Sequence, residues 1–376
     1  MIAPSAFVQE LQKQGTGFFT GVPDSLLKNL CAYITDSFDA EHHIIAANEG
    51  NAVGLAAGHY LATGTIPMVY MQNSGEGNAV NPLLSLADTD VYQIPLLLCI
   101  GWRGEPSVHD EPQHVKQGKV TLSLLETMGI PYQVLSSDEA TMKAQVEQVY
   151  ATMKAGHAPV ALIVKKGLFA EYTLQQSVCV EGQLTREEAL EIIVKHAAPH
   201  AIFVSTTGMA SRELYEIRER HGEGHEKDFL TVGSMGHASQ IALGIALNKK
   251  HRQVFCLDGD GAALMHLGGM AIIGTRKPEN YFHIILNNGS HDSVGGQPTV
   301  GREVDMVGVS ASLGYATSVK VTDESTLVDA LSTKKTGPHC IEVLVKKGNR
   351  KDLGRPKSTP VENKQAFMHY IAEETT

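Results

Sequence analysis

Residues 254–290 read VFCLDGDGAALMHLGGMAIIGTRKPENYFHIILNNGS, and this stretch decides the fold. An apolar run over 254–257 predicts a buried parallel strand, because it stops abruptly at Gly259-Asp260-Gly261. The residues over 262–273 predict one helix that is apolar on most of its sides. Gly268-Gly269 would let that helix lie close to a neighbour.

A second strand is predicted after this helix, over 281–286, and it ends at Asn287-Asn288-Gly289. Both strands of such a unit end at the same edge of a parallel sheet, so Asp260 and Asn288 can face each other. A carboxylate and an amide oxygen are hard ligands suited to Mg²⁺. Neighbouring glycines let the backbone approach a phosphate bound to that ion. Either motif alone also fits an ordinary turn, so the prediction depends on the pair.

Composition narrows the class of protein. The chain has 376 residues, enough for two domains, and its 43% hydrophobic and 19% charged residues are typical of a globular protein. Its formal net charge of −10, without a basic run, argues against binding to nucleic acid or to an anionic membrane. Residues 1–15 lack a basic cluster followed by an apolar core, so no targeting segment is expected.

Cysteine usage favours a reducing cytoplasm. The chain has five scattered cysteines and no closely spaced pair, so neither a disulfide framework nor a zinc site is predicted. They are Cys31, Cys99, Cys179, Cys256 and Cys340. The longest uncharged apolar run, over 94–102, is too short to cross a membrane.

Two segments recur at nearly the same offset. Gly75-Glu76-Gly77 precedes Gly259-Asp260-Gly261 by 184 residues, and the apolar segment 159–167 precedes its match at 340–348 by 181. This spacing predicts two domains of similar fold, related by a duplication. The alternative is that the ends of apolar strands simply look alike.

The predicted domains are residues 1–170 and 185–376, joined by a polar linker over 171–184. Thr185 and Glu188 form a capping-box pattern that would start the second domain. Ser25 is expected to cap the helix predicted over 26–38. The charged segment 346–357 is expected to be a solvated arm.

With these motifs in this order, the chain resembles the thiamine-diphosphate-dependent decarboxylases. In that superfamily a pyrimidine-binding domain carries a glutamate, and a diphosphate-binding domain carries the Gly-Asp-Gly and Asn-Asn motifs. The resemblance implies an α/β fold of two doubly wound, mostly parallel-sheet domains, the first binding the pyrimidine and the second the diphosphate. It implies Mg²⁺ held by Asp260, Asn288 and the backbone carbonyl of Ser290. The implied cofactor-binding residues are Glu49, Thr207, Gly208, Ser234, Met235, Gly236, Gly259, Asp260, Gly261, Ala262 and Asn288.

Two of these residues keep alternative explanations. Glu49 would hydrogen-bond the cofactor's pyrimidine, and burial between an apolar strand and a small-residue helix would raise its pKa. Alternatively, its carboxylate stabilises a helix N-terminus behind an Asn48 cap. Met235 would hold the cofactor bent, or it is an ordinary core residue.

Segments 21–25, 102–118 and 205–214 narrow the resemblance to phosphonopyruvate decarboxylases, which are close to sulfopyruvate decarboxylases. This implies non-oxidative decarboxylation of 3-phosphonopyruvate to phosphonoacetaldehyde and CO₂, in phosphonate biosynthesis. It also implies a homodimer or higher homo-oligomer with active sites between subunits and a small 2-oxo acid as substrate. The rival functions are a sulfopyruvate decarboxylase, a carboligase, and a non-catalytic sensor that binds the cofactor.

Residues that would handle protons and the phosphonate come from two loops. Asp24, His109 and His114 are candidates for proton relay, and Arg103 and Lys116 for binding the phosphonate. The alternatives are that the histidines are ordinary loop residues, and that Arg103 and Lys116 pair with nearby acidic residues. Those acidic residues are Glu105, Asp110 and Glu111.

Overall fold

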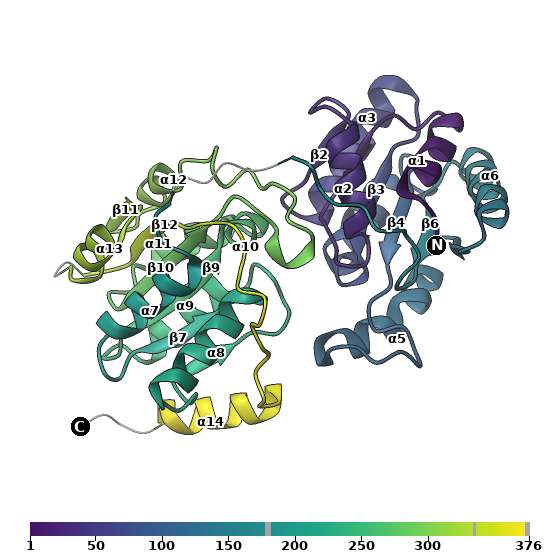
Figure 1. The fold of residues 1–376 in the computed structure, drawn as a ribbon. Helices are drawn as coiled ribbons and strands as arrows, with labels where there is room; N and C mark the ends of the chain where they lie inside the picture. The colour runs from purple at the N-terminus through teal and green to yellow at the C-terminus, as the bar shows by residue number, and fades with distance from the viewer. Residues whose placement is uncertain (177–181, 334–335, 373–376) are drawn as a thin grey trace. The chain divides into compact units, whose positions relative to one another are not determined.

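The computed structural model describes residues 1–176, 182–333 and 336–372, and these form two compact units (Figure 1). Unit 1 is Met1–Ser177 with Ser293–Gln297, and unit 2 is Val178–Asp292 with Pro298–Thr376. Residues 177–181, which include Cys179 and part of the predicted linker, lie outside the described residues. The boundaries of the two predicted domains therefore stay a prediction.

Unit 1 is a parallel sheet with a buried apolar cluster on each face. Its six described strands pair in the order β2-β1-β3-β4-β6-β5, always in parallel. Successive side chains of a strand point to opposite faces, so Met68 and Tyr70 join one cluster and Val69 and Met71 the other. The strands are β1 (Phe19–Gly21), β2 (His43–Ile45), β3 (Met68–Gln72), β4 (Leu97–Gly101), β5 (Tyr132–Val134) and β6 (Val160–Val164). The helices are α1 (Pro4–Lys13), α2 (Lys28–Ser37), α3 (Glu49–Thr63), α4 (Glu76–Pro82), α5 (Pro112–Thr127) and α6 (Glu139–Gly156).

Unit 2 is built in the same way, with its six described strands in the order β11-β12-β10-β9-β7-β8. Phe255 and Leu257 of β9 pack on one face of this sheet, and Val254 and Cys256 on the other. The strands are β7 (Ile202–Ser205), β8 (Asp228–Leu230), β9 (Val254–Gly259), β10 (Tyr281–Asn287), β11 (Thr317–Val321) and β12 (His339–Leu344). The helices are α7 (Arg186–His196), α8 (Met209–His221), α9 (Ala238–Asn248), α10 (Asp260–Met265), α11 (Gly268–Arg276), α12 (Met306–Ser312), α13 (Glu324–Leu331) and α14 (Pro360–Ala372).

The two sheets have the same topology, which confirms the prediction of two similar parallel-sheet domains. Read from β8, the order in unit 2 is 8-7-9-10-12-11, which is the order 2-1-3-4-6-5 of unit 1 with six added to each number. Strand β9 therefore corresponds to β3, and β10 corresponds to β4. By this correspondence, Asp260 at the start of α10 has Glu76 at the start of α4 as its counterpart.

The prediction of one helix after Asp260 is wrong. Helix α10 ends at Met265, and α11 begins at Gly268. His266 leaves the helical region with φ −132° and ψ 48°, which breaks the run of helical hydrogen bonds. The glycine pair does allow a close approach, because a Cβ on Gly269 would lie 2.6 Å from Nε2 of Gln240.

Of the two predicted caps, one is confirmed and one is wrong. Thr185 forms the predicted capping box, in which its side chain and that of Glu188 each accept from the other's backbone N–H. Ser25 does not cap α2. Instead, Oδ2 of Asp24 accepts hydrogen bonds from the backbone N–H groups of Leu26 at 2.9 Å and Leu27 at 3.2 Å.

The expectation of a solvated arm over 346–357 is only half right, because most of this segment is exposed but it is docked on unit 2. Arg350 forms ion pairs with Glu216 and, at 3.1 Å, with Glu187. The backbone N–H of Gly354 donates to Oε1 of Glu216 at 2.6 Å. Long-range partners thus hold a segment whose local composition predicts only exposure.

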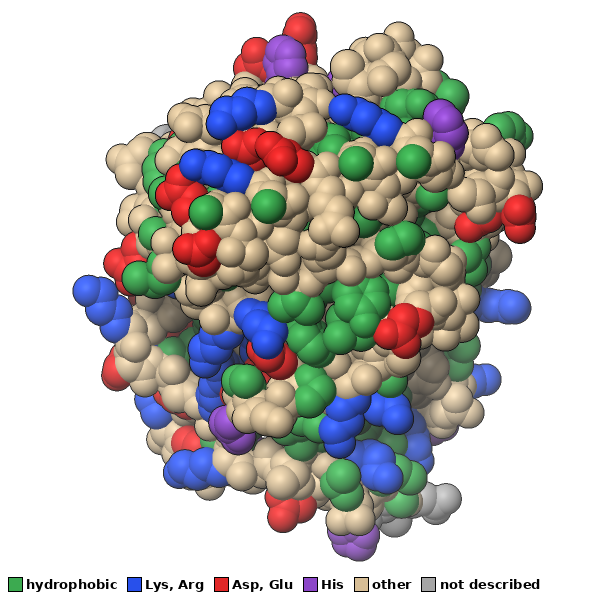
Figure 2. Space-filling model, turned by 90° about the vertical axis from the view of Figure 1, so that its right-hand side faces the viewer, with side chains coloured by type: hydrophobic (Ala, Val, Ile, Leu, Met, Phe, Trp, Pro, Cys, Tyr) green, Lys and Arg blue, Asp and Glu red, His purple; other side chains and the backbone are tan. Residues whose placement is uncertain are grey.

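The surface carries mixed charges. On the face shown in Figure 2, acidic, basic and apolar side chains all appear, and no single kind covers it. Within the described ranges, no helix combines the length and the apolar character that crossing a membrane requires.

Candidate active site

Asp260 and Asn288 meet at the carboxyl edge of the unit 2 sheet. Strands β9 and β10 pair directly, with Leu286 opposite Gly259, so the residues that follow the two strands come close together. Both side chains are buried, with 2% of Asp260 and 4% of Asn288 exposed. The backbone N–H of Asn288 is one of the groups that lower the pKa of the Asp260 carboxyl, which places the two in contact.

The Asp260 carboxylate is suited to a cation. Burial raises its pKa to about 6, although a hydrogen bond from the Thr299 hydroxyl opposes that shift. A Cβ on Gly301 would lie 2.5 Å from Oδ2 of Asp260, so only glycine lets the chain cover this carboxylate so closely. A cation beside it would offset the cost of burying the negative charge.

The rest of the ligand set lies in the turn after β10. Oδ1 of Asn288 accepts a hydrogen bond from the backbone N–H of Ser290 at 3.0 Å. Ser290 also forms an isolated antiparallel β-bridge with Pro298. The Ser290 hydroxyl oxygen is buried and has no hydrogen-bond partner among the described residues. The predicted ligands are one carboxylate, one amide oxygen and one backbone carbonyl, which are the kinds of oxygen donor that Mg²⁺ prefers, so the residues present fit the predicted metal.

The predicted diphosphate residues gather at this same edge from three loops, after β7, β8 and β9. Gly208, with φ 101°, precedes α8, and Gly236, with φ 83°, precedes α9. Both conformations favour glycine. At Gly236 a Cβ would also lie 2.7 Å from the His266 ring. Thr207 precedes Gly208, and Ser234 and Met235 precede Gly236. The backbone oxygen of Ala262 would lie 3.1 Å from a Cβ on Gly236.

Met235 is partly exposed and belongs to neither buried apolar cluster of unit 2. This counts against ordinary core packing. Its role under the cofactor stays a prediction.

Glu49 is the first residue of α3 in unit 1, and it is 5% exposed. The amide nitrogen of Asn78 donates to Oε2 of Glu49 at 2.7 Å, and burial raises the pKa of this carboxyl. A Cβ on Gly75 would lie 2.2 Å from Oε1, so the Gly75-Glu76-Gly77 turn closes over the carboxyl group.

The structure contains the Asn48 cap that the alternative role of Glu49 requires. Asn48 already caps α3, because its side chain accepts the backbone N–H of Asn51 at 2.9 Å. Glu49 lies in the first turn of α3 behind this cap, and its carboxyl group also accepts a hydrogen bond from Asn78 of the next helix, which favours the role as a buried acid.

Glu76 is the positional counterpart of Asp260 but has different surroundings. Its Oε1 is buried without a hydrogen-bond partner in the described part of the chain, and burial raises its pKa to about 8. Strand β4, the counterpart of β10, ends at Gly101 and is followed by Trp102, whereas β10 ends at Asn287 and is followed by Asn288. Unit 1 therefore does not repeat the metal motif.

Arg103 is engaged within its own loop. Its guanidinium forms two hydrogen bonds with the Asp110 carboxylate, one from Nε at 2.7 Å and the other from Nη2. Nη1 donates to the Ser25 hydroxyl at 2.7 Å. The nearby Glu105 pairs instead with Lys165 at 2.6 Å. Of the alternatives open from sequence, pairing of Arg103 with Asp110 is the one observed.

The remaining candidates of unit 1 differ in exposure. Asp24 is fully buried, and burial raises its pKa to about 6 although Arg103 opposes the shift. His114, at the start of α5, is 8% exposed, whereas His109 and Lys116 are exposed. Of the two histidines, only His114 therefore lies inside the fold.

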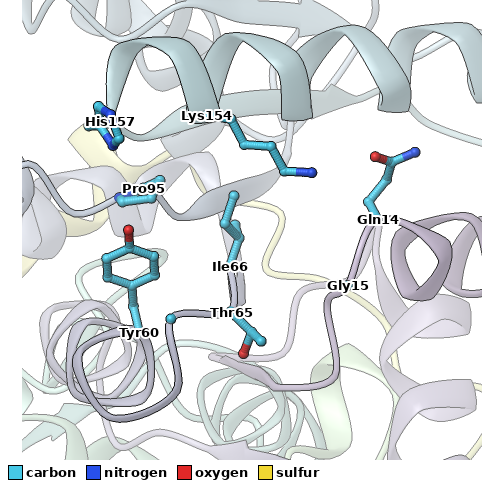
Figure 3. A pocket seen from close by; sticks show the side chains of 9 residues that line it. Gln14, Gly15, Tyr60, Thr65, Ile66, Pro95, Lys154 and His157 are labelled. Atoms are coloured by element: carbon cyan, nitrogen blue, oxygen red, sulfur yellow. The ribbon is translucent and has the colours of Figure 1, made fainter.

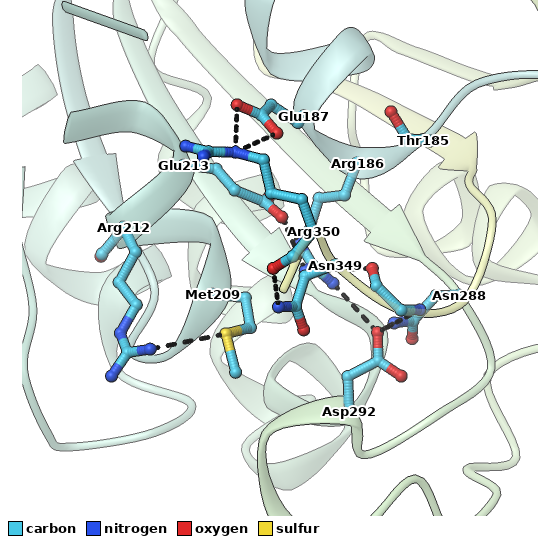
Figure 4. Close-up of polar contacts among 12 residues, drawn as sticks. Thr185, Arg186, Glu187, Met209, Arg212, Glu213, Asn288, Asp292, Asn349 and Arg350 are labelled. Atoms are coloured by element: carbon cyan, nitrogen blue, oxygen red, sulfur yellow. Dashed lines mark hydrogen bonds and ion pairs between the residues drawn. The ribbon is translucent and has the colours of Figure 1, made fainter. Parts of the chain in front are cut away.

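Several residues at the site carry no sequence signal that predicts them. Thr299 and Gly301 cover Asp260, and Asp292 accepts a hydrogen bond from Asn288. Asp292 in turn contacts Arg186 (Figure 4). Only the spacing of four residues between Asn288 and Asp292 hints at their contact.

Two other features of the fold are not part of this site. A cavity of about 280 Å³ lies at the amino edge of the unit 1 sheet, where the strands begin and α1, α3 and α6 end (Figure 3). In unit 2, Cys256, Asp258 and His283 lie close together, but both ring nitrogens of His283 already have partners. These are Asp258 at 3.3 Å and the Tyr315 hydroxyl at 3.1 Å, so the group is a hydrogen-bonded core cluster.

Comparison with known proteins places the chain in a class. Residues 1–124 match the family model for the thiamine pyrophosphate enzyme, N-terminal TPP binding domain, and residues 206–343 match the model for the C-terminal TPP binding domain. Thiamine pyrophosphate and thiamine diphosphate are the same cofactor. The two matching domains make this chain a thiamine-diphosphate-dependent enzyme.

Individual relatives narrow the class. The chain is 34% identical to a phosphonopyruvate decarboxylase of Streptomyces viridochromogenes, over 99% of this chain and 95% of the relative. The chain belongs to the phosphonopyruvate decarboxylase family. It is also 29% identical to a sulfopyruvate decarboxylase of Methanosarcina acetivorans, over 99% of this chain and 98% of that protein.

Two further relatives are separate subunits that each match about half of the chain. The sulfopyruvate decarboxylase subunit beta of Methanococcus maripaludis is 33% identical over 50% of this chain and 98% of its own length. The subunit alpha of Methanocaldococcus jannaschii is 34% identical over 46% of this chain and 97% of its own length.

Proposed function

We propose that this chain decarboxylates 3-phosphonopyruvate to phosphonoacetaldehyde and CO₂, with thiamine diphosphate and Mg²⁺ as cofactors and a role in phosphonate biosynthesis. The observation that carries the proposal is the buried Asp260–Asn288 pair, in a chain that matches a phosphonopyruvate decarboxylase along 99% of its length. We assign the pyrimidine to residues 1–170 and the diphosphate to residues 185–376.

Thiamine diphosphate supplies a carbon nucleophile for the ketone and a ring that takes up the electrons left when CO₂ departs. Asp260, Asn288 and the Ser290 carbonyl would hold the Mg²⁺ that offsets the charge of the diphosphate. The glycine turns after β7, β8 and β9 let backbone N–H groups approach that group.

Proton handling is assigned to unit 1. Burial raises the pKa of Glu49, so its carboxyl group can hold a proton against a ring nitrogen of the pyrimidine. Asp24, with a pKa of about 6, can gain and lose a proton near neutral pH. His114 and His109 are the further relay candidates, and the burial of His114 favours it over His109.

The function is tested by measuring CO₂ release from phosphonopyruvate, sulfopyruvate and pyruvate with Mg²⁺ and thiamine diphosphate. We expect phosphonopyruvate to have the highest kcat/KM, with phosphonoacetaldehyde as the only organic product. The full-length match to a sulfopyruvate decarboxylase makes sulfopyruvate the second candidate substrate. A higher kcat/KM for sulfopyruvate would establish that alternative, and a carbon–carbon coupled product would establish a carboligase.

The phosphonate needs a local cation in this acidic chain, and Arg103 and Lys116 are the candidates. Lys116→Ala should lower kcat/KM for phosphonopyruvate about 10- to 150-fold, the value of a charge-assisted hydrogen bond, and should spare pyruvate. Arg103→Ala should lower kcat/KM for both substrates, because Arg103 holds Asp110 and Ser25 in place. Lys119→Ala, one turn further along α5, is the matched control. If Arg103→Ala affects phosphonopyruvate alone, Arg103 is the phosphonate ligand.

We also propose a homodimer or higher homo-oligomer with active sites between subunits. Apolar side chains on α3 and in the segment after α4 support it, with Leu55 38%, Leu61 70% and Leu84 40% exposed. Gly54 and Gly58 lie on α3 with open space beside them, so another helix can approach closely. Sedimentation should give at least twice the mass of one chain, and a monomer with full activity would contradict the proposal.

A further inference from the structure

We propose that Asp292 is a positioning residue, which orients the Asn288 amide so that its oxygen faces the metal. Asp292 touches neither substrate nor metal in this role and acts only through Asn288. The inference rests on the proposed metal site, and it concerns the binding of the cofactor and its metal rather than the choice of substrate.

Three hydrogen bonds converge on Oδ2 of Asp292, and Figure 4 shows those from Asn288 and Arg186. They come from Nδ2 of Asn288 at 2.7 Å, the backbone N–H of Gly348 at 2.8 Å and Nη1 of Arg186 at 3.3 Å. The Asp292 side chain is only 7% exposed, so water competes little for these bonds.

The two ends of the Asn288 amide have different neighbours. A carboxylate only accepts, so the amide nitrogen must face Asp292. A backbone N–H only donates, so the amide oxygen must face Ser290. Without Asp292, only the backbone N–H of Ser290 would select this orientation, so the oxygen and nitrogen could exchange places at a lower cost. A nitrogen turned toward Mg²⁺ cannot bind it.

Arg186 holds Asp292 from a fixed position. Its Nε and Nη2 donate to the two Glu213 oxygens at 2.7 Å and 2.9 Å, and both side chains are buried. This paired contact sets the plane of the guanidinium, so the remaining nitrogen points to Asp292 (Figure 4). Arg186 at the start of α7 and Gly348 in the docked segment after β12 thus both hold Asp292, in the loop that follows Asn288.

The role of Asp292 can be tested in two backgrounds, the natural protein with Asn288 and the Asn288→Asp variant. In the natural background, Asp292→Ala should weaken binding of thiamine diphosphate at fixed Mg²⁺ by about 10- to 100-fold, as loss of a residue that supports a metal ligand does. Asn288→Asp offers an oxygen at either end, so its orientation no longer matters, and Asp292 would repel it. In that background, Asp292→Ala should therefore strengthen binding.

Calorimetry of cofactor binding and the electron paramagnetic resonance spectrum of Mn²⁺ in the Mg²⁺ site give the readouts. Asp352→Ala is the control, because Asp352 is 82% exposed and pairs with Arg350, at 3.1 Å.

If Asp292→Ala does not fold, Asp292→Asn serves in both backgrounds. Its amide oxygen can accept from the natural Asn288, and its amide nitrogen can donate to the carboxylate that Asn288→Asp introduces. A smaller loss and the same reversal of sign are then expected.

Weakening by the same factor in both backgrounds would overturn the inference and leave Asp292 a purely structural role. An unchanged affinity in the natural background would also overturn it. Asp260→Ala separates these results from failure of the metal assignment, because that variant tests the site without Asp292. The substrate preference of the enzyme does not affect any of these outcomes.

Discussion

Replacing Glu49 with glutamine is expected to lower the turnover of phosphonopyruvate by about 100- to 10,000-fold, the contribution typical of a general acid or base. Glutamine has nearly the same shape, and its oxygen can still accept the hydrogen bond from Asn78. It cannot hold an exchangeable carboxyl proton against the pyrimidine. The protein should therefore keep its fold and most of its affinity for thiamine diphosphate.

Two measurements separate this loss from a loss of structure. Hydrogen–deuterium exchange at the reactive carbon of the bound cofactor should slow with turnover, and calorimetry should show cofactor binding retained. Glu10→Gln is the matched control, because Glu10 is also a buried glutamate but pairs with Lys13 on α1. A Glu49→Gln enzyme with near-normal exchange and turnover would return Glu49 to a structural role.

Replacing Asp260 with alanine should abolish Mg²⁺-dependent binding of the cofactor. One unit charge about 4 Å away contributes about 4 kcal/mol at an effective dielectric near 20. This corresponds to about a 1,000-fold change in affinity. Asp260 is the one carboxylate among the proposed ligands, so alanine leaves only neutral oxygens. Asp260→Asn keeps an oxygen without the charge. Its affinity for the cofactor should fall between that of the natural protein and that of Asp260→Ala.

Calorimetric titration of thiamine diphosphate, with Mg²⁺ and with a chelator, measures this effect. Asp323→Ala provides the control, because Asp323 caps α13 in the same unit and is partly exposed. It should lose some stability, about 1 kcal/mol for a helix cap, without changing the dependence on metal. Unchanged affinity of Asp260→Ala, or of the natural protein after chelation, would refute the metal assignment.

Much of the fold could be predicted because its signals are local. The apolar runs that became β9 and β10 lie in one stretch, and each ends in a turn with glycine. The break after α10 could not be predicted in this way, because Gly268-Gly269 is compatible with a continuous helix. Contact with Gln240, from α9, accompanies the break there.

At Glu49 and Arg103, too, the local sequence left alternatives open and contacts in the folded chain decided between them. The sequence left Glu49 open between a carboxylate that stabilises a helix N-terminus behind the Asn48 cap and a buried acid that binds the pyrimidine. Gly75 and Asn78 from the next strand–helix turn supply the burial and the hydrogen bond that favour the acid. Arg103 had several acidic neighbours in its own loop, and only the folded loop selects Asp110.

The sequence by itself determined the class of fold and the proposed ligand pair, Asp260 and Asn288, because both follow strands adjacent in the chain and must reach one edge. Only the tertiary structure decided what surrounds that pair. Arg186 lies 106 residues from Asp292, and Gly348 lies 56 residues from it. Hydrophobic periodicity specifies which face of a strand or helix is buried, but not which distant segments meet. Those contacts depend on how the whole sheet and the segment after β12 pack together, so they are read from the folded chain.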